Sequence, residues 1–142
     1  MIIDAQNYFS TAQAVTSTAI SENIIDLGVA RDMGAGQPVW IVCQVTTAIA
    51  TESSGTVVVT VVNHSSEPSS GQGTTIMTLG TFTAGSADAG AKLQAILPPC
   101  ATDLQYLAVQ YTVSGVSAGA VDCFLTPTPD NPKFYPDAVT IS

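Results

Sequence analysis

The chain is poor in charge, in aromatic residues and in histidine. Charged residues are 10% of its 142 residues, aromatic residues are 6%, and the one histidine is His64. An ordinary soluble protein has roughly 25% charged residues, so much of this surface must be left to small neutral side chains. Such a composition is typical of a protein that rests against other protein. The scarcity of aromatic residues also argues against a lectin that stacks sugars.

The charge that is present is almost all acidic. Three basic residues, Arg31, Lys92 and Lys133, stand against eleven acids, and the formal net charge is −8. A phosphate backbone would repel this chain, and no cluster of basic residues compensates. Nucleic-acid binding is therefore disfavoured, and the acidic surface is interpreted first as an aid to solubility.

Long apolar runs are absent as well. No window approaches the roughly 18 apolar residues of a membrane helix, so we expect no membrane partner. The opening Met-Ile-Ile-Asp-Ala-Gln has no positive n-region and no continuous apolar h-region, so no signal peptide is expected. Of the three cysteines, Cys43 and Cys123 lie within apolar strand patterns, and with Cys100 they show no metal-ligand spacing. We predict unpaired core thiols for those two, in a chain that folds in a reducing cytoplasm.

No stretch carries recognisable catalytic chemistry. His64 is not accompanied by a Gly-x-Ser-x-Gly elbow. One histidine and three scattered cysteines supply no metal cluster, and the carboxylates do not form a calcium loop. A glycine-rich phosphate loop is also missing. We therefore expect a protein that is not an enzyme and that needs no cofactor or metal.

What the sequence has in abundance is extended, β-branched segments. The clearest is Thr56 to Asn63, Thr-Val-Val-Val-Thr-Val-Val-Asn, in which alternate side chains point to opposite faces. Both faces are apolar, and an exposed strand of this kind would aggregate, so it is predicted to be central.

Period-2 alternation predicts further strands over residues 38–46, 103–113 and 120–126, with shorter candidates at 23–27, 74–82 and 92–97. We expect two hairpins, one joining 38–46 to 56–63 and one joining 103–113 to 120–126. The predicted inward side chains of the three longer strands are Val39, Ile41, Cys43 and Val45, then Leu107, Val109, Tyr111 and Val113, then Val121, Cys123 and Leu125.

No segment keeps a helical period, and seven or eight short strands separated by Gly, Pro and Ser indicate an all-β protein. We predict a single-domain antiparallel β-sandwich over residues 1–126, including an extended N-terminal segment, and a jelly roll fits the strand count. Residues 127–142 contain four prolines and are predicted to form an extended arm. Phe134 and Tyr135 give that arm a means of docking on another subunit or on its own domain.

Two other places offer candidate contacts. Tyr8 and Phe9 are large apolar residues outside a recognisable element, so they either pack on the sandwich or dock on a neighbour. Arg31 and Asp32 lie in a glycine-rich loop. Arginine is enriched at interface hot spots, so this pair either contacts a neighbouring protein or pins the loop internally.

Several stretches together carry a family resemblance. They are Ile3-Asp4-Ala5-Gln6, Phe9-Ser10, Ala12-Gln13-Ala14-Val15-Thr16, Ile25-Asp26-Leu27-Gly28, Arg31-Asp32-Met33-Gly34-Ala35-Gly36, Tyr106-Leu107-Ala108-Val109-Gln110-Tyr111-Thr112-Val113 and Ala118-Gly119-Ala120-Val121. Over most of residues 1–125 the chain resembles the small capsid cement, or decoration, proteins of tailed bacteriophages. The N-terminal segment is the most specific part of the likeness. The proline-rich tail from Pro127 departs from the family pattern, which usually ends soon after the last strand.

The resemblance implies a non-enzymatic structural protein of jelly-roll fold. It would bind the outside of an icosahedral capsid in the virion as a homotrimer, after synthesis in the host cytoplasm. Its partners would be the major capsid protein and itself, and it would bridge and stabilise the capsid subunits. The candidate intersubunit or capsid contacts are Tyr8, Phe9, Gln13, Arg31, Asp32, Phe134 and Tyr135.

Three alternatives stay open. A carbohydrate- or host-binding module would have to use Trp40, Tyr8, Tyr106 or Tyr135, the available aromatic side chains. A small hydrolase would need a reactive His64. A tail or fibre accessory protein would share the fold and differ in its place on the virion.

Overall fold

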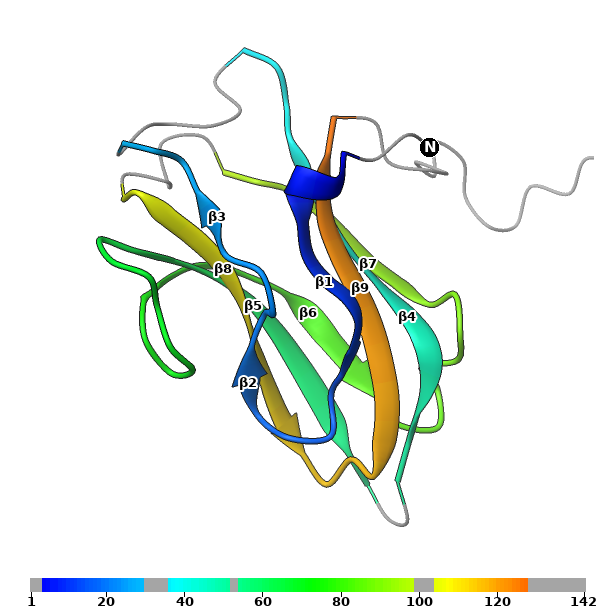
Figure 1. Ribbon diagram of the computed structural model, residues 1–142. Helices are drawn as coiled ribbons and strands as arrows, with labels where there is room; N and C mark the ends of the chain where they lie inside the picture. Colours follow the sequence, from blue (N-terminus) through cyan, green and yellow to red (C-terminus); the bar gives the residue numbers. More distant parts are fainter. Residues whose placement is uncertain (1–3, 30–35, 52–53, 99–103, 128–142) are drawn as a thin grey trace, which may run out of the picture.

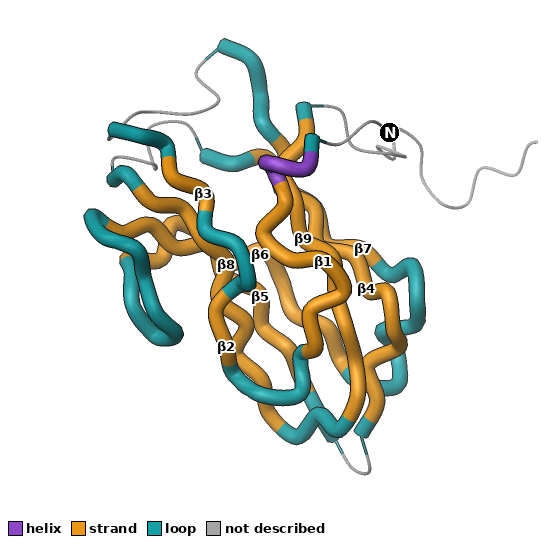
Figure 2. Tube along the Cα trace, in the orientation of Figure 1, coloured by secondary structure: helices purple, strands orange, loops and turns teal. Residues whose placement is uncertain are grey.

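The protein is described by a computed structural model over residues 4–29, 36–51, 54–98 and 104–127 (Figure 1). In these ranges nearly all regular structure is strand, and the helical part is a single 3-10 turn (Figure 2). Two antiparallel sheets pack face to face, so the predicted all-β sandwich is confirmed. The elements are η1 (Ala5–Asn7), β1 (Tyr8–Ala14), β2 (Ala19–Ile20), β3 (Ile25–Asp26), β4 (Trp40–Ala50), β5 (Thr56–His64), β6 (Thr74–Thr83), β7 (Lys92–Ile96), β8 (Tyr106–Ser114) and β9 (Ala118–Thr126).

The strand order is that of a jelly roll. One sheet has the order β1-β9-β4-β7 and the other β2-β8-β5-β6, with β3 also pairing β8. The pairs are nested along the chain: β1 with β9, β2 and β3 with β8, β4 with β7, and β5 with β6. Successive pairs alternate between the two sheets, as in a long hairpin rolled into a double-sheet jelly roll.

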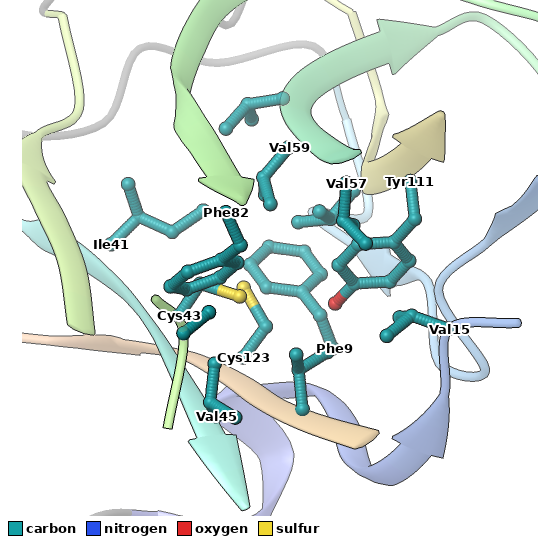
Figure 3. Packing of buried hydrophobic residues seen from close by; sticks show 14 of the residues in the cluster. Phe9, Val15, Ile41, Cys43, Val45, Val57, Val59, Phe82, Tyr111 and Cys123 are labelled. Atoms are coloured by element: carbon teal, nitrogen blue, oxygen red, sulfur yellow. The ribbon is translucent and has the colours of Figure 1, made fainter. Parts of the chain in front are cut away.

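The core lies between the sheets and is built from the predicted inward faces. Val57, Val59 and Val61 of β5 have no exposed surface, and β5 is paired on both sides, by β8 and β6, as a central strand should be. Phe9, Phe82 and Tyr111 fill the space between the valines and the facing sheet (Figure 3). Packing of this kind removes the apolar side chains from water, which is the main stabilisation of a sandwich.

The two core cysteines face each other across the β4–β9 ladder. Cys43 and Cys123 are Cα partners in adjacent antiparallel strands, and their sulfur atoms lie side by side (Figure 3). Both are free and buried, so the prediction of unpaired core thiols is confirmed. A hydrogen bond with Cys123, together with burial, raises the pKa of the Cys43 thiol well above its ordinary value. Cys100 lies outside the described residues.

Both predicted hairpins are wrong. β4 and β5 are consecutive but belong to different sheets, and the same is true of β8 and β9. The short connections after β4 and β8 carry the chain across the sandwich instead of back along the same sheet. Each of these strands then pairs with strands distant in sequence, β4 with β7 and β9, and β8 with β5 and the short β2 and β3.

Strand β1 was not predicted, because its alternation is interrupted. Its pairing with β9 shifts register between Tyr8 and Ser10 and again between Ser10 and Gln13. Ala12 lies within the second shift with φ of 47°, in the left-handed region that residues other than glycine rarely adopt. The buried positions Ser10 and Gln13 are polar, so no apolar stripe marks this strand in the sequence.

The register sorts the loops into two ends of the sandwich. At the open end, β1 and β4 begin and β9 and β7 finish, because Tyr8 pairs with Phe124, and Trp40 pairs with both Thr126 and Ile96. β3 also finishes there and β8 begins (Figure 1). At the closed end lie the connections β1–β2, β4–β5, β6–β7 and β8–β9.

Candidate interaction surface

An apolar row crosses the outer face of the first sheet near the open end. Tyr8 of β1 is the Cα partner of Phe124 on β9, and Phe124 is the partner of Val42 on β4. Cross-strand partners project from the same face of a sheet, so these three side chains lie next to one another. A second row beside it contains Trp40 and Ile96, which are partners in the β4–β7 ladder.

We call Tyr8, Trp40, Val42, Ile96 and Phe124 together the apolar strip. Val42 and Phe124 are only 1% and 2% exposed, although neither belongs to the core cluster between the sheets. The Tyr8 ring packs against the Phe124 ring at a centroid distance of 5.3 Å and an interplanar angle of 51°. Tilted contacts of this kind are favoured by the quadrupoles of the rings. The outer face therefore carries an apolar cluster of its own.

Polar residues bound the strip on the side away from the open end. The next row contains Asp122 of β9, Gln44 of β4 and Lys92 of β7, which are partners across the ladders. Asp122 accepts a hydrogen bond of 2.6 Å from the backbone N–H of Ala12 at the bulge of β1. Gln94, beside Val42, has a buried side-chain oxygen without a hydrogen-bond partner. The strip thus has a polar margin, as protein interfaces usually do.

The 3-10 turn η1 directly precedes Tyr8 and positions it on this face. Asp4 caps the turn, and its carboxylate accepts a hydrogen bond of 3.0 Å from the backbone N–H of Gln6. The N–H of Asn7 then donates to the carbonyl of Asp4 at 2.9 Å. The turn therefore holds the chain directly before Tyr8 and sets where β1 enters the sheet.

Exposed apolar residues gather at the open end. Two large hydrophobic side chains are exposed among the described residues, Ile96 at 45% and Val29 at 61%. Ile96 ends β7, and Val29 follows β3, so both belong to this end of the sandwich. Single exposed apolar residues are common, but Ile96 is also the cross-strand partner of the half-buried Trp40. The combination marks the open end as the better candidate for contact with another protein.

Asp26 provides the described part of this end with a fixed negative charge. Its carboxylate accepts hydrogen bonds of 2.8 Å from the side-chain amide of Gln105 and from the backbone N–H of Gly28. Chiefly the Gln105 bond, and then the Gly28 bond, lower the pKa of Asp26 below its ordinary value. The carboxylate is solvent-exposed, so it offers charge to a partner at neutral pH.

Two of the predicted contact residues face inward. Phe9 has no exposed surface and packs in the core cluster, so it is not available to a partner, and of its two alternatives the structure shows packing on its own sandwich. Gln13 is 7% exposed, and its amide donates to the carbonyl of Ile20 at 2.8 Å. The backbone N–H of Glu22 donates to the Gln13 side-chain oxygen at 3.0 Å. Gln13 therefore joins β1 to the β2 segment.

Gln13 also belongs to a buried polar chain that spans the two sheets. The Ser10 hydroxyl donates to the Gln13 side-chain oxygen at 2.6 Å and lies 2.7 Å from the Tyr111 hydroxyl. Because the Ser10 proton is directed to Gln13, the Tyr111 hydroxyl is the donor to Ser10. Burial raises the pKa of Tyr111 well above its ordinary value. This chain ties β8 of one sheet to β1 of the other.

Of the remaining predicted contact residues, one lies on the apolar strip and four lie outside the described residues. Tyr8 lies half-buried on the apolar strip, whereas Arg31, Asp32, Phe134 and Tyr135 lie outside the described residues. Sequence reasoning placed Trp40, Val42 and Phe124 on outward faces but did not join them into one surface. The sequence signal for this surface was the presence of three outward apolar residues on two predicted strands. Ile96 gave no comparable signal, because only the β4–β7 register puts it beside Trp40.

The described residues considered for a hydrolase, a carbohydrate-binding module or a metal site do not come together in one place. His64 ends β5, and its Nδ1 accepts a hydrogen bond of 3.0 Å from the backbone N–H of Ser66, within the same turn. Tyr106 begins β8 in the second sheet, whereas Tyr8 and Trp40 belong to the first. In the described ranges no three His, Cys, Asp or Glu side chains gather into a possible metal site. Those ranges also hold no helix of the length and apolarity needed to cross a membrane.

Comparison with known proteins gives one family match. Residues 9–125 match the family described as Bbp16. The matched range covers most of the chain and includes β2 to β8 in full, and β1 and β9 each without one terminal residue. No curated protein matches the sequence.

Proposed function

The chain belongs to the Bbp16 family, a phage-related family, and we propose that it is a structural protein of the virion that binds and stabilises the capsid. The family match over residues 9–125 is the observation that carries the proposal. The resemblance to capsid cement proteins points in the same direction. The proposed protein is not an enzyme, and it works by occupying the outer surface of the capsid.

The physical properties of the chain support this proposal. Only 10% of its residues are charged, and an apolar strip lies on the outside of the sandwich. Both features favour a chain that spends its working life against other protein. A net charge of −8 disfavours the packaged nucleic acid as a partner and keeps the free protein soluble before assembly.

In the proposed mechanism the protein acts as a homotrimer. A closed three-fold trimer would bury its own interface and present three equivalent surfaces to adjacent major capsid protein subunits. Three linked contacts act at a high effective concentration, so each contact can be weak while the trimer as a whole stays bound. Bridged subunits would then resist the outward pressure of packaged DNA.

The first test is the location of the protein on purified virions. Cryo-electron microscopy should show jelly-roll density on the outside of the shell, and this density should be missing from virions grown without the gene. Shells without the protein should break at a lower temperature. Density at the tail, or binding of the free protein to glycans without a capsid contact, would replace this proposal with a tail accessory or a carbohydrate-binding protein.

The second test is the mass of the free protein by light scattering over a range of concentrations. A mass about three times the 14.5 kDa of the chain is expected. A dimer would contradict the three-fold arrangement but not binding to the capsid. A monomer at every concentration would restrict trimer formation to the capsid surface.

A further inference from the structure

Part of the apolar strip stays exposed to solvent in a single subunit. Ile96 is 45% exposed, and Tyr8 and Trp40 are partly exposed, while Val42 and Phe124 on the same face are buried. The strip thus combines two buried side chains with three that are accessible. An aromatic or aliphatic group placed on it would be removed from water on contact.

The chain leaves the sandwich beside this strip. Thr126, the last residue of β9, is the Cα partner of Trp40, which in turn is the partner of Ile96. The strip includes Phe124 of β9 itself, and its other residues lie on β1, β4 and β7. Adjacent strands lie about 4.8 Å apart, so the strip extends to about two strands from β9. Residues 128–142 follow Pro127 and lie outside the described part.

The sequence that follows carries apolar groups suited to the strip. Phe134 and Tyr135 are adjacent, and prolines stand at 127, 129, 132 and 136. Prolines restrict the backbone to extended conformations, so a segment of this composition loses less entropy when it docks. Paired aromatic side chains supply a large contact area with few rotatable bonds.

The chain length allows the arm to reach a neighbouring copy. Phe134 is eight residues beyond Thr126, and an extended proline-rich segment advances about 3.1 Å per residue, so it covers roughly 25 Å. The strip of the same subunit lies within about 10 Å of Thr126, two strand spacings away. A fully extended arm is therefore long enough to place its aromatic pair beyond its own strip and on a neighbouring copy.

We propose that the apolar strip of each subunit receives the arm, residues 128–142, of a neighbouring copy, with Phe134 and Tyr135 seated against Trp40, Tyr8 and Ile96. This inference rests on the proposed self-association and names the surfaces that make it. The exchange of arms closes a ring of subunits when each copy gives one arm and receives one. The strip is then an intersubunit surface, and the capsid is contacted elsewhere.

Trp40 is the only tryptophan of the chain, so its fluorescence reports directly on the strip. In the full-length protein, the double variant Phe134→Ala/Tyr135→Ala should move Trp40 emission to longer wavelength. Acrylamide quenching should increase at least about twofold, because the indole loses its aromatic cover. The matched control Thr140→Ala alters the same arm but keeps both aromatic rings, and it should leave the emission unchanged.

A complementation experiment separates a neighbour's arm from the subunit's own. Trp40→Phe subunits have intact arms and no tryptophan, whereas Phe134→Ala/Tyr135→Ala subunits have the tryptophan and defective arms. When the two are co-expressed, emission should return toward that of the original protein. Emission that stays red-shifted in the mixed protein would mean that each arm covers its own strip, and would overturn the inference.

The strip has one other possible occupant, the capsid itself. If the isolated protein and the double variant give the same Trp40 emission, and emission shifts only when capsids are added, the arm does not dock on the strip and the inference is wrong. The proposed function is judged separately by the location of the protein on virions. Each proposal can therefore fail without the other.

Discussion

The two ends of the sandwich are built in different ways. At the closed end, backbone hydrogen bonds join two connections to the end of β4: Ser117 N–H donates to the Ala50 carbonyl at 2.9 Å, and Ile49 N–H donates to the Ala87 carbonyl at 3.0 Å. At the open end, partly exposed Tyr8 and Trp40 and exposed Ile96 are available. The open end is also joined by backbone hydrogen bonds, such as Leu97 N–H to the Val39 carbonyl at 2.8 Å, but it exposes apolar side chains that a partner could cover as well.

The closed end depends on close backbone approach. A Cβ atom added at Gly115 would lie 2.6 Å from the carbonyl oxygen of Ser54, and one added at Gly55 would lie 2.6 Å from the carbonyl oxygen of Gly115. The Thr51 hydroxyl also donates to the Gly115 carbonyl. These contacts leave no room for a side chain at Gly55 or Gly115. We therefore expect substitutions at the closed end to change stability and those at the open end to change association.

The largest expected effect is that of Gly115→Ala. Gly115 has φ of +66° and a backbone oxygen 2.6 Å from the added Cβ, so the variant suffers both conformational strain and a clash with main chain. We expect a loss of about 3 kcal/mol in the free energy of unfolding, measured by urea titration.

The control for that variant is Gly85→Ala. Gly85 has φ of +84° but no atom within 4 Å of an added Cβ, so it carries the strain alone. A loss of about 1 kcal/mol is expected there. Equal losses at the two positions would show that close approach at the closed end contributes nothing.

An intermediate effect is expected between the ends, where Tyr111 donates to Ser10. The folded-state pKa of Tyr111 lies above the ordinary value of 10.0, so the native protein holds this proton more tightly than the unfolded chain. Its contribution to stability is complete below pH of about 10 and is lost as pH rises through the folded-state pKa. The melting temperature should therefore fall above pH of about 10, and Tyr111→Phe should fall less steeply.

The control for this prediction is the stability of Tyr111→Phe at neutral pH. At pH 7 Tyr111→Phe loses one buried hydrogen bond and should be less stable by about 1 kcal/mol. If the variant and the original protein lose stability in parallel from pH 9 to 11, Tyr111 is not the group responsible. The Cys43 thiol, whose pKa is also raised, would then be the next to examine.

The smallest effect on stability is expected at the open end. Ile96→Ser changes a side chain that is already 45% exposed, so the unfolding free energy of the dilute, monomeric protein should change by less than about 0.5 kcal/mol. The same substitution removes apolar surface from the strip and should lower the mass found by light scattering at a given concentration.

Val29→Ser is the matched control for Ile96→Ser. Val29 is 61% exposed at the same end but does not belong to the apolar strip. Its substitution should leave both stability and association unchanged. A Val29 variant that associates as poorly as the Ile96 variant would extend the interaction surface from the strip to the whole open end.

Much of the fold could be predicted because burial imposes a period of two on strands. The valines of β5 and the alternate residues of β4, β8 and β9 are apolar where they face the core, and this pattern is visible without coordinates. The failure at β1 is equally physical. Ser10 and Gln13 are buried as polar groups because Tyr111 and the β2 segment satisfy their hydrogen bonds. No local sequence pattern predicts a hydrogen-bond partner as distant in the chain as Tyr111 is from Ser10.

The candidate surface was predictable in part. Alternation placed Trp40 and Val42 on the outward face of one strand and Phe124 on that of another. That these strands are neighbours follows from the β4–β9 pairing, which joins segments about eighty residues apart. The contact between Tyr8 and Phe124 likewise depends on a strand that the sequence did not reveal.

By itself the sequence determined the fold class, most strands, their core faces and the burial of Cys43 and Cys123, because side-chain alternation is a local consequence of burial. Only the tertiary structure decided which strands are neighbours. A short connection can either turn back within a sheet or cross to the other, and the alternation along the strand is the same in both cases. The crossings after β4 and β8 bring β1, β4, β7 and β9 into one sheet and so assemble the apolar strip.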